Sequence, residues 1–346
     1  MMMAKILPAG KLSHELLDSL LKRYSSADRS VAAGAATGID AAILRHSGPL
    51  LFAKTDPVTL VTMDLGHYVV NINANDIASM GGKPKWFMVT LLFPADGTNR
   101  RIVESVFSGI REACDALRVS FCGGHTELTD AVTRVVAVGA MLGPAMTNRT
   151  FQASRAMAGD VLVLTKGIAI EGSSIIARER RGEVLEMWGE DFWARCMGFL
   201  RDPGISVVPE ARIAARIPGV HAMHDPTEGG LATALHELAD AAGVGFIIQR
   251  DKIPVLPETD LLCRRYGIDP LGLIASGALL VAVGVRQAGR LVAALSKGGV
   301  KSAVIGRLVE DPPQRSIVIR GRRCRLRRFD RDEILKVGRG ILQTRT

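Results

Sequence analysis

The sequence has few cysteines, and none of them are spaced for a structural metal site. The 346 residues include five cysteines, an odd number, and no Cys-x-x-Cys pair. This argues against a disulfide framework and against structural zinc. The longest uncharged apolar stretch, Leu273–Val285, is also too short for a membrane span, which needs roughly 20 residues. Since the N-terminus shows no apolar core followed by a cleavage site, we expect a cytoplasmic protein without a membrane anchor.

Aromatic residues are scarce as well, at 5% of the chain. A net charge of +9 is compatible with a nucleic-acid partner, but here it is concentrated in one segment. Residues 315–331 hold eight arginines and one aspartate, and the rest of the chain carries only +2. Nucleic-acid sites more often mix basic residues with aromatics. We therefore predict a solvated basic hairpin at residues 316–329 and no nucleic-acid partner.

The common nucleotide and metal motifs are missing. The chain has no G-x-x-x-x-G-K-[ST] phosphate loop, no G-x-G-x-x-G fingerprint and no H-E-x-x-H helix. His221 and His224 have metal-ligand spacing, but Pro226 follows closely and indicates a turn instead of a metal-binding helix.

Strand and helix patterns alternate and include hairpin signals, which favours an α+β fold in both halves. The small and polar tract 143–159 is the best boundary, giving domains 1–150 and 151–346. We expect helices at 13–24, 66–80, 101–117, 172–180, 209–217 and 287–296. Expected strands are 50–54, 58–62, 86–93, 119–122, 132–141 and 160–164.

The remaining candidates for chemistry are acidic residues beside glycine or proline, predicted to lie in loops. Taken singly, Asp40, Asp56, Glu127 and Asp225 are compatible with ordinary turn chemistry. Asp76 is different, because the stretch "NINANDIASM" places it with three asparagines inside an otherwise apolar helix. Buried polar groups need partners. Their density here suggests a ligand.

The order of these motifs resembles the aminoimidazole ribonucleotide synthetase (PurM-like) superfamily over residues 10–329. The segments that carry the resemblance are "GIDAA", "TDP", "NANDIASMGGKP", "GGHTELT", "HDPTEGGLATALHELA" and "DPLGLIASGALL". Within the superfamily the chain looks most like the HypE-type hydrogenase maturation proteins. The resemblance implies a two-domain PurM-like α+β fold with a C-terminal α/β sandwich-like domain. It also implies an N-terminal sheet that pairs across a homodimer, ATP and Mg²⁺ as cofactors, and a small-molecule or protein-borne substrate between the domains.

The resemblance also assigns roles to individual residues. Asp40, Asp56 and Asp76 would bind the metal, and Asp76, His125 and Asp225 would act in catalysis. Besides the three metal ligands, the nucleotide or substrate would contact Asn75, Gly123, Gly124, Thr126, Glu127 and Thr227. These types suit a triphosphate, because Mg²⁺ bridges carboxylates and phosphate oxygens while glycines let backbone amides approach phosphate.

Three departures from the HypE pattern leave the activity open. The chain ends in "GRGILQTRT" without the terminal cysteine, Ser276 precedes Gly277 where HypE has an acid, and His125 follows the glycine pair in place of another acid. We therefore expect an ATP- and Mg²⁺-dependent enzyme that activates or phosphorylates an acceptor oxygen on a separate substrate. The alternatives are hydrogenase maturation with an altered tail and a catalytically inactive nucleotide-binding partner.

The last cysteine, Cys324, lies in the alternating stretch "RRCRLRRF". Strand periodicity puts Cys324 and Leu326 on one face and arginines on the other, so we expect Cys324 to be buried. A buried thiol is a poor nucleophile. We therefore expect that the protein carries no carbamoyl or cyano group on this cysteine.

Overall fold

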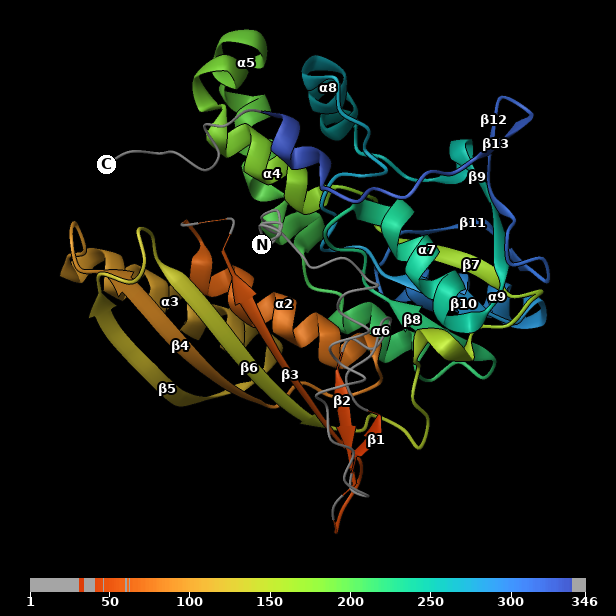
Figure 1. Ribbon diagram of the computed structural model, residues 1–346, viewed down its shortest axis with the longest axis horizontal. Coiled ribbons are helices and arrows are strands. Elements are labelled where there is room, and N and C mark those ends of the chain that lie inside the picture. The colour runs from red at the N-terminus through yellow and green to blue at the C-terminus, as the bar shows by residue number, and fades with distance from the viewer. Residues whose placement is uncertain (1–30, 34–40, 46, 60, 62, 338–346) are drawn as a thin grey trace, which may run out of the picture.

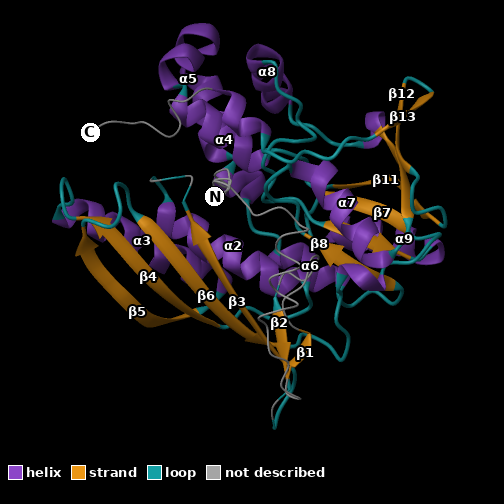
Figure 2. Ribbon diagram, viewed as in Figure 1, coloured by secondary structure: helices purple, strands orange, loops and turns teal. Residues whose placement is uncertain are grey.

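A computed structural model describes residues 31–33, 41–45, 47–59, 61 and 63–337 (Figure 1). The predicted helix 13–24 and the predicted metal ligand Asp40 lie outside the described residues. The described chain contains two mixed sheets with helices packed on them, which confirms the α+β prediction (Figure 2).

The N-terminal half is a six-stranded sheet covered by two helices on one face (Figure 1). Helices α2 (Leu65–Ser79) and α3 (Arg100–Leu117) lie against alternate residues of β4, including Phe87 and Leu91, that are fully buried. Gly66 lets the two helices touch, because a Cβ there would overlap the backbone of α3. The strand order is β1 (Val31–Ala33), β2 (Ala42–Leu44), β3 (Leu51–Val58), β6 (Val136–Pro144), β4 (Trp86–Pro94), β5 (Ser120–Thr129).

Two predicted loops of this half are strands, so those predictions were wrong. Strand β3 runs without a break through Asp56 and Pro57, because β2 pairs only with its first three residues and leaves Pro57 where a missing N–H is tolerated. Strand β5 includes the whole "GGHTELT" segment. Gly123 and Gly124 have φ of 116° and 147°, and a Cβ on Gly124 would overlap the Val89 carbonyl, so the ladder with β4 continues only because these residues are glycines.

The C-terminal half is built on a seven-stranded sheet. Its order is β13 (Arg322–Arg325), β12 (Arg315–Ile319), β9 (Gly245–Gln249), β11 (Ser302–Val309), β7 (Val161–Thr165), β10 (Leu280–Val283), β8 (Val220–His224). The helices are α4 (Ile170–Glu179), α5 (Arg181–Gly198), α6 (Val208–Ala214), α7 (Gly230–Ala242), α8 (Pro257–Tyr266) and α9 (Val285–Lys297). Short helical turns occur at Ala153–Arg155, Leu200–Gly204, Arg250–Lys252 and Glu333–Val337. In the described part of the chain no helix is long and apolar enough to cross a membrane.

One of the two hydrophobic clusters among the described residues extends across both halves, and the other lies within the C-terminal half. Buried side chains of α2 pack in the same cluster as those of α4, α5 and α6 from the C-terminal half. Arg149, in the connection between the sheets, donates to the carbonyls of Ala215 and Ile217 at 2.7 and 3.1 Å. These contacts fix the surfaces that face each other between the halves. The division at residue 150 stays a prediction.

The predicted basic hairpin is present, but the prediction that Cys324 is buried was wrong. Strands β12 and β13 pair with Ile317 opposite Cys324, and Leu326 is 4% exposed as expected. Cys324 itself is exposed, because β13 is the edge strand. All four residues of β13 are exposed, and the strand ends at Arg325, before the buried Leu326. Burial therefore gives no reason for this thiol to be unreactive.

Candidate functional site

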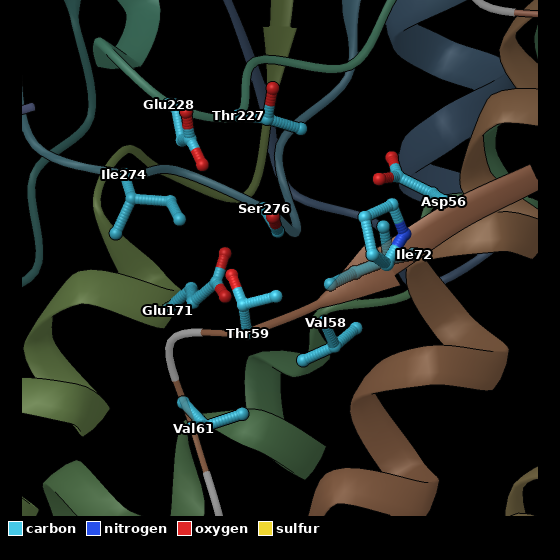
Figure 3. Close-up of a pocket in the computed structure, with 11 residues that line it drawn as sticks. Asp56, Val58, Thr59, Val61, Ile72, Glu171, Thr227, Glu228, Ile274 and Ser276 are labelled. Carbon is cyan, nitrogen blue, oxygen red and sulfur yellow. The ribbon is translucent and has the colours of Figure 1, made fainter. Parts of the chain in front are cut away.

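A cavity of about 80 Å³ opens between the two halves (Figure 3). Its N-terminal wall comes from the end of β3, the residues after it, and Ile72 of α2. Its C-terminal wall comes from the start of α4, the turn after β8 and the segment before β10. The described lining residues are Asp56, Pro57, Val58, Thr59, Val61, Ile72, Glu171, Thr227, Glu228, Ile274 and Ser276.

The structure brings together two of the predicted metal ligands, Asp56 and Asp76, around a shared cation. The ammonium group of Lys54 lies 3.2 Å from Asp76 Oδ2 and 3.6 Å from Asp56 Oδ2. Asp76 is nearly buried on α2, whereas Asp56 on β3 is one-third exposed and reaches the cavity. The two carboxylates thus form one negative site beside the cavity, and Lys54, which sequence reasoning missed, offsets one of the two charges.

The asparagines near Asp76 hold backbone segments in place. Asn73 Nδ2 donates to the carbonyls of Val69 and Asp56, at 2.8 and 3.2 Å, and so ties α2 to β3. Asn75 Nδ2 donates to the Ile205 carbonyl, and its Oδ1 accepts from the Val207 amide, both at 2.8 Å. The polar density of this helix therefore serves the junction of the two halves. The assignment of Asn75 to the nucleotide stays a prediction.

The site residues predicted on the glycine-rich segment lie away from the cavity. Gly123, Gly124, His125, Thr126 and Glu127 are on β5, which β6 and β4 separate from β3 and Asp56. The His125 and Glu127 side chains are exposed and paired with each other, with Nε2 and Oε2 3.1 Å apart. Within one chain these residues do not meet the cavity.

The turn after β8 is only partly in the cavity. Thr227 lines it, but Asp225, 2% exposed, does not. His224 contacts Glu237 at 3.0 Å, and His221 contacts Asp160 at 2.8 Å, so the two histidines contact separate carboxyl groups and do not share one metal site.

Glu171, at the start of α4, is the most unusual titratable group of the cavity and was not predicted. Burial raises the pKa of its carboxyl to about 7, against a lowering hydrogen bond from Ser276, while Asp332 and Glu228 raise it further. Burial likewise raises the pKa of Asp332 to about 6. This wall of the cavity therefore carries several carboxyl groups in a poorly solvated environment.

The donor set fits a Mg²⁺ ion that binds phosphate as well. Mg²⁺ is commonly held by one or two carboxylates, with phosphate oxygens and waters completing its shell. Asp56 and Asp76 both lie close to the ammonium group of Lys54. Among the described residues there is no cluster of three or more side chains that could bind a metal ion. Two carboxylates are therefore better suited to a metal ion that arrives bound to a nucleotide than to a metal ion held entirely by protein ligands.

Comparison with known proteins gives matches along most of the chain. The model of the AIR synthase related protein N-terminal domain matches residues 38–144, and that of the C-terminal domain matches residues 157–319. A carbamoyl dehydratase HypE from Rhodobacter capsulatus is 29% identical, covering 78% of each chain. A selenide, water dikinase from Aeromonas salmonicida is 28% identical, covering 86% of this chain and 91% of the other.

Solved structures with the same PurM-like fold include two nucleotide complexes. The hydrogenase maturation protein HypE in complex with ATP has a TM-score of 0.72 at 20% identity, covering 95% of this chain and 98% of that one. AaThiL complexed with AMPPCP and TMP has a TM-score of 0.71 at 20% identity, covering 90% and 94%.

Proposed function

Because the chain belongs to the AIR synthase related family, we propose that it is an ATP- and Mg²⁺-dependent enzyme that phosphorylates or activates an acceptor oxygen on a separate substrate. The observation that carries the proposal is the Asp56–Lys54–Asp76 group at the edge of a cavity between the halves. The ATP and AMPPCP complexes of structural neighbours support the choice of nucleotide.

The charges of this group suit a triphosphate only when a divalent ion is bound. Two carboxylates repel phosphate by on the order of 4 kcal/mol per unit charge pair at 4 Å and an effective dielectric of 20. Mg²⁺ held by Asp56 and Asp76 would neutralise phosphate charge and orient the γ-phosphate. Lys54, between the two carboxylates, adds a fixed positive charge. We propose that phosphate enters from this N-terminal wall.

Hydrogenase maturation with an altered tail is the second candidate, favoured by relatives that are carbamoyl dehydratases. The exposed Cys324 is then the residue to examine. A carbamoyl or cyano adduct on Cys324, found by peptide mass spectrometry after incubation with ATP and a carbamoyl-donating partner, would favour this candidate over the first.

The direct test is thermal unfolding with and without Mg-ATP, followed by analysis of the nucleotide products. Ligand at 100 times its Kd stabilises the folded state by about 2.7 kcal/mol. For a chain of this length we expect the midpoint to rise by a few degrees. Product formation supports an enzyme, and a shift without any product supports an inactive nucleotide-binding partner. No shift with saturating Mg-ATP would contradict the proposal.

We also propose that two copies pair through the uncovered face of the N-terminal sheet. Helices α2 and α3 cover one face, and no described element covers the other (Figure 2). That other face carries Trp86 and Met88, which are 37% and 42% exposed, with Leu142 on neighbouring β6. An apolar sheet face of this kind is typical of a protein interface. β5 is the edge strand, so its glycine-rich segment would lie at the seam between the copies.

Introducing a charge on this face is expected to separate the copies. In Met88→Asp, a carboxylate would be buried without a partner at the interface, and we expect the dimer Kd to rise at least 100-fold. Analytical ultracentrifugation measures the change. The matched control is Ile102→Asp, an equally exposed site on α3, outside the sheet. A monomeric wild-type protein, or equal effects of the two variants, would contradict the proposed interface.

A further inference from the structure

The hairpin of β12 and β13 leaves one edge of the C-terminal sheet open. Strand β13 is the last strand of that sheet, and Figure 1 shows the hairpin projecting there. The amide of Leu326 donates to the Arg315 carbonyl in β12, and inward and outward backbone groups alternate along an antiparallel strand. The N–H and C=O groups of Arg323 and Arg325 therefore point away from β12. No element that the structure describes pairs with them, and an open edge of this kind is a template for a further strand.

The arginines of this hairpin fall into two groups. At its base, Arg315 and Arg328 contact the Asp240 carboxylate of α7 at 2.8 and 3.4 Å. The arginines at the tip and along the open edge are exposed and form no ion pair with a described residue: Arg320, Arg322, Arg323 and Arg325. The base of the hairpin is thus neutralised by the rest of the protein, whereas four guanidinium groups repel one another at its end. An anionic partner would relieve that repulsion.

The turn of the hairpin carries an arginine where the backbone favours other residues. Arg320 and Gly321 form the two-residue loop between Ile319 and Arg322, and their φ angles are 49° and 76°. Loops with positive φ at both positions are usually Asn-Gly or Gly-Gly, because a larger side chain is strained there. Arg320 therefore adds charge to the tip while it destabilises the turn, and backbone strain of this kind clusters at functional sites.

The chemistry of the edge favours an acidic polypeptide over a nucleic acid. Guanidinium groups bind carboxylate and phosphate alike. Sites for single-stranded nucleic acid also present aromatic side chains on which bases stack, and residues 315–328 include no aromatic residue. The open backbone groups match the main chain of an extended peptide, which can add to the sheet as a strand. Arg323 and Arg325 are two residues apart, so their side chains share a face and meet every second residue of that strand.

We propose that β13 is a docking site for an extended segment of a partner protein with Asp or Glu at every second position. The segment pairs its backbone with that of Arg323 and Arg325, and its carboxylates contact the guanidinium groups of these two arginines. Arg320 and Arg322 add positive potential at the tip of the hairpin. None of these four residues lines the cavity between the halves, so the proposal goes beyond the proposed function and does not depend on it.

A fluorescein-labelled peptide of four Thr-Glu repeats tests the site by fluorescence anisotropy. At about 0.15 M salt, where the Debye length is about 8 Å, we expect the wild-type protein to bind it at least tenfold more tightly than a peptide of four Thr-Gln repeats. Methylation of the amide nitrogens of the peptide removes its backbone donors and should weaken binding at least fivefold. Arg323→Gln/Arg325→Gln should weaken it at least tenfold. The matched control, Arg286→Gln/Arg290→Gln, removes two exposed charges on α9 and should bind within twofold of the wild type.

A second variant changes the charge of the tip while it improves the turn. Asparagine suits positive φ, so Arg320→Asn should unfold at the same temperature as the wild type or a higher one, yet bind the Thr-Glu peptide at least threefold more weakly. Circular dichroism follows the unfolding of each variant. If the hairpin were only a solvated surface element, the unfolding temperature would change and peptide binding would not.

Three other results would also overturn the proposal. The first is equal binding of the Thr-Glu and Thr-Gln peptides, or unchanged Thr-Glu binding in both hairpin variants. The second is tighter binding of a single-stranded oligothymidylate of the same length, which would assign the edge to nucleic acid. The third is conversion of a wild-type oligomer to a monomer by Arg323→Gln/Arg325→Gln in sedimentation, which would assign the edge to a second copy of this chain.

Discussion

Asp76→Asn is expected to weaken Mg-ATP binding at least tenfold, about 1.4 kcal/mol, while leaving the protein folded. Asparagine has nearly the same shape as aspartate but removes one of the two carboxylates around Lys54. The proposed metal site then has a single charged ligand, and the Lys54 ammonium loses the nearer of the two carboxylates, at 3.2 Å. Isothermal titration calorimetry with Mg-ATP measures the affinity, and thermal unfolding verifies the fold.

Asp64→Asn is the matched control for this prediction. Asp64 lies just before α2, at the other end of the helix from Asp76, and pairs with Arg178 at 2.7 Å. The variant removes the same charge at a position that does not line the cavity, so its Mg-ATP affinity should stay within twofold of the wild type. Unchanged affinity in a folded Asp76→Asn protein would remove Asp76 from the nucleotide site.

Lys166→Met is expected to have the largest effect on stability, a loss of about 3–5 kcal/mol. The Lys166 ammonium is 2.8 Å from Glu210 Oε1 and donates to the carbonyls of Gly204 and Ser206 at 3.0 and 2.6 Å. Both side chains of the ion pair are less than 9% exposed. Methionine keeps the length of the side chain but leaves the Glu210 carboxylate buried without its cation. Urea unfolding of the two proteins measures the difference.

A double variant separates the lost ion pair from lost packing. Lys166→Met combined with Glu210→Leu removes both charges and should recover at least half of the lost stability, since a buried pair can often be replaced by apolar residues at little cost. A double variant that is no more stable than Lys166→Met would show that the loss comes from packing or from the two carbonyls, and not from the uncompensated carboxylate.

Two long helices of the N-terminal half were predictable because α3 is strongly amphipathic and α2 is a long apolar run that ends at Gly81 and Gly82. The predicted helices 66–80 and 101–117 correspond to α2 (Leu65–Ser79) and α3 (Arg100–Leu117). Strands β3 and β5 were misjudged because proline and glycine usually mark turns. In β5 the glycines are needed where the backbone passes close to β4, which depends on a neighbouring strand and not on local sequence.

Only the part of the candidate site that a local sequence pattern marks could be predicted from the sequence. The polar stretch on α2 pointed to Asp76, and the resemblance to a family added Asp56. Lys54 could have been found, because it lies two residues before Asp56, and residues i and i+2 of a strand share a face. Glu171 could not, since the segment "AIEGSS" looks like an ordinary helix start and becomes a site only when Ser276 and the N-terminal wall meet it.

The position of Asn75 next to Asp76 has a mechanical consequence. One turn of α2 carries both the carboxylate that faces Lys54 and the amide that holds the backbone at Ile205 and Val207. The segment held by Asn75 also supplies the Ser206 carbonyl that binds Lys166, so it is anchored to both sheets. Because one helix turn carries both side chains, we expect that a backbone shift of this turn at Asp76 also moves the segment held by Asn75 at Ile205 and Val207.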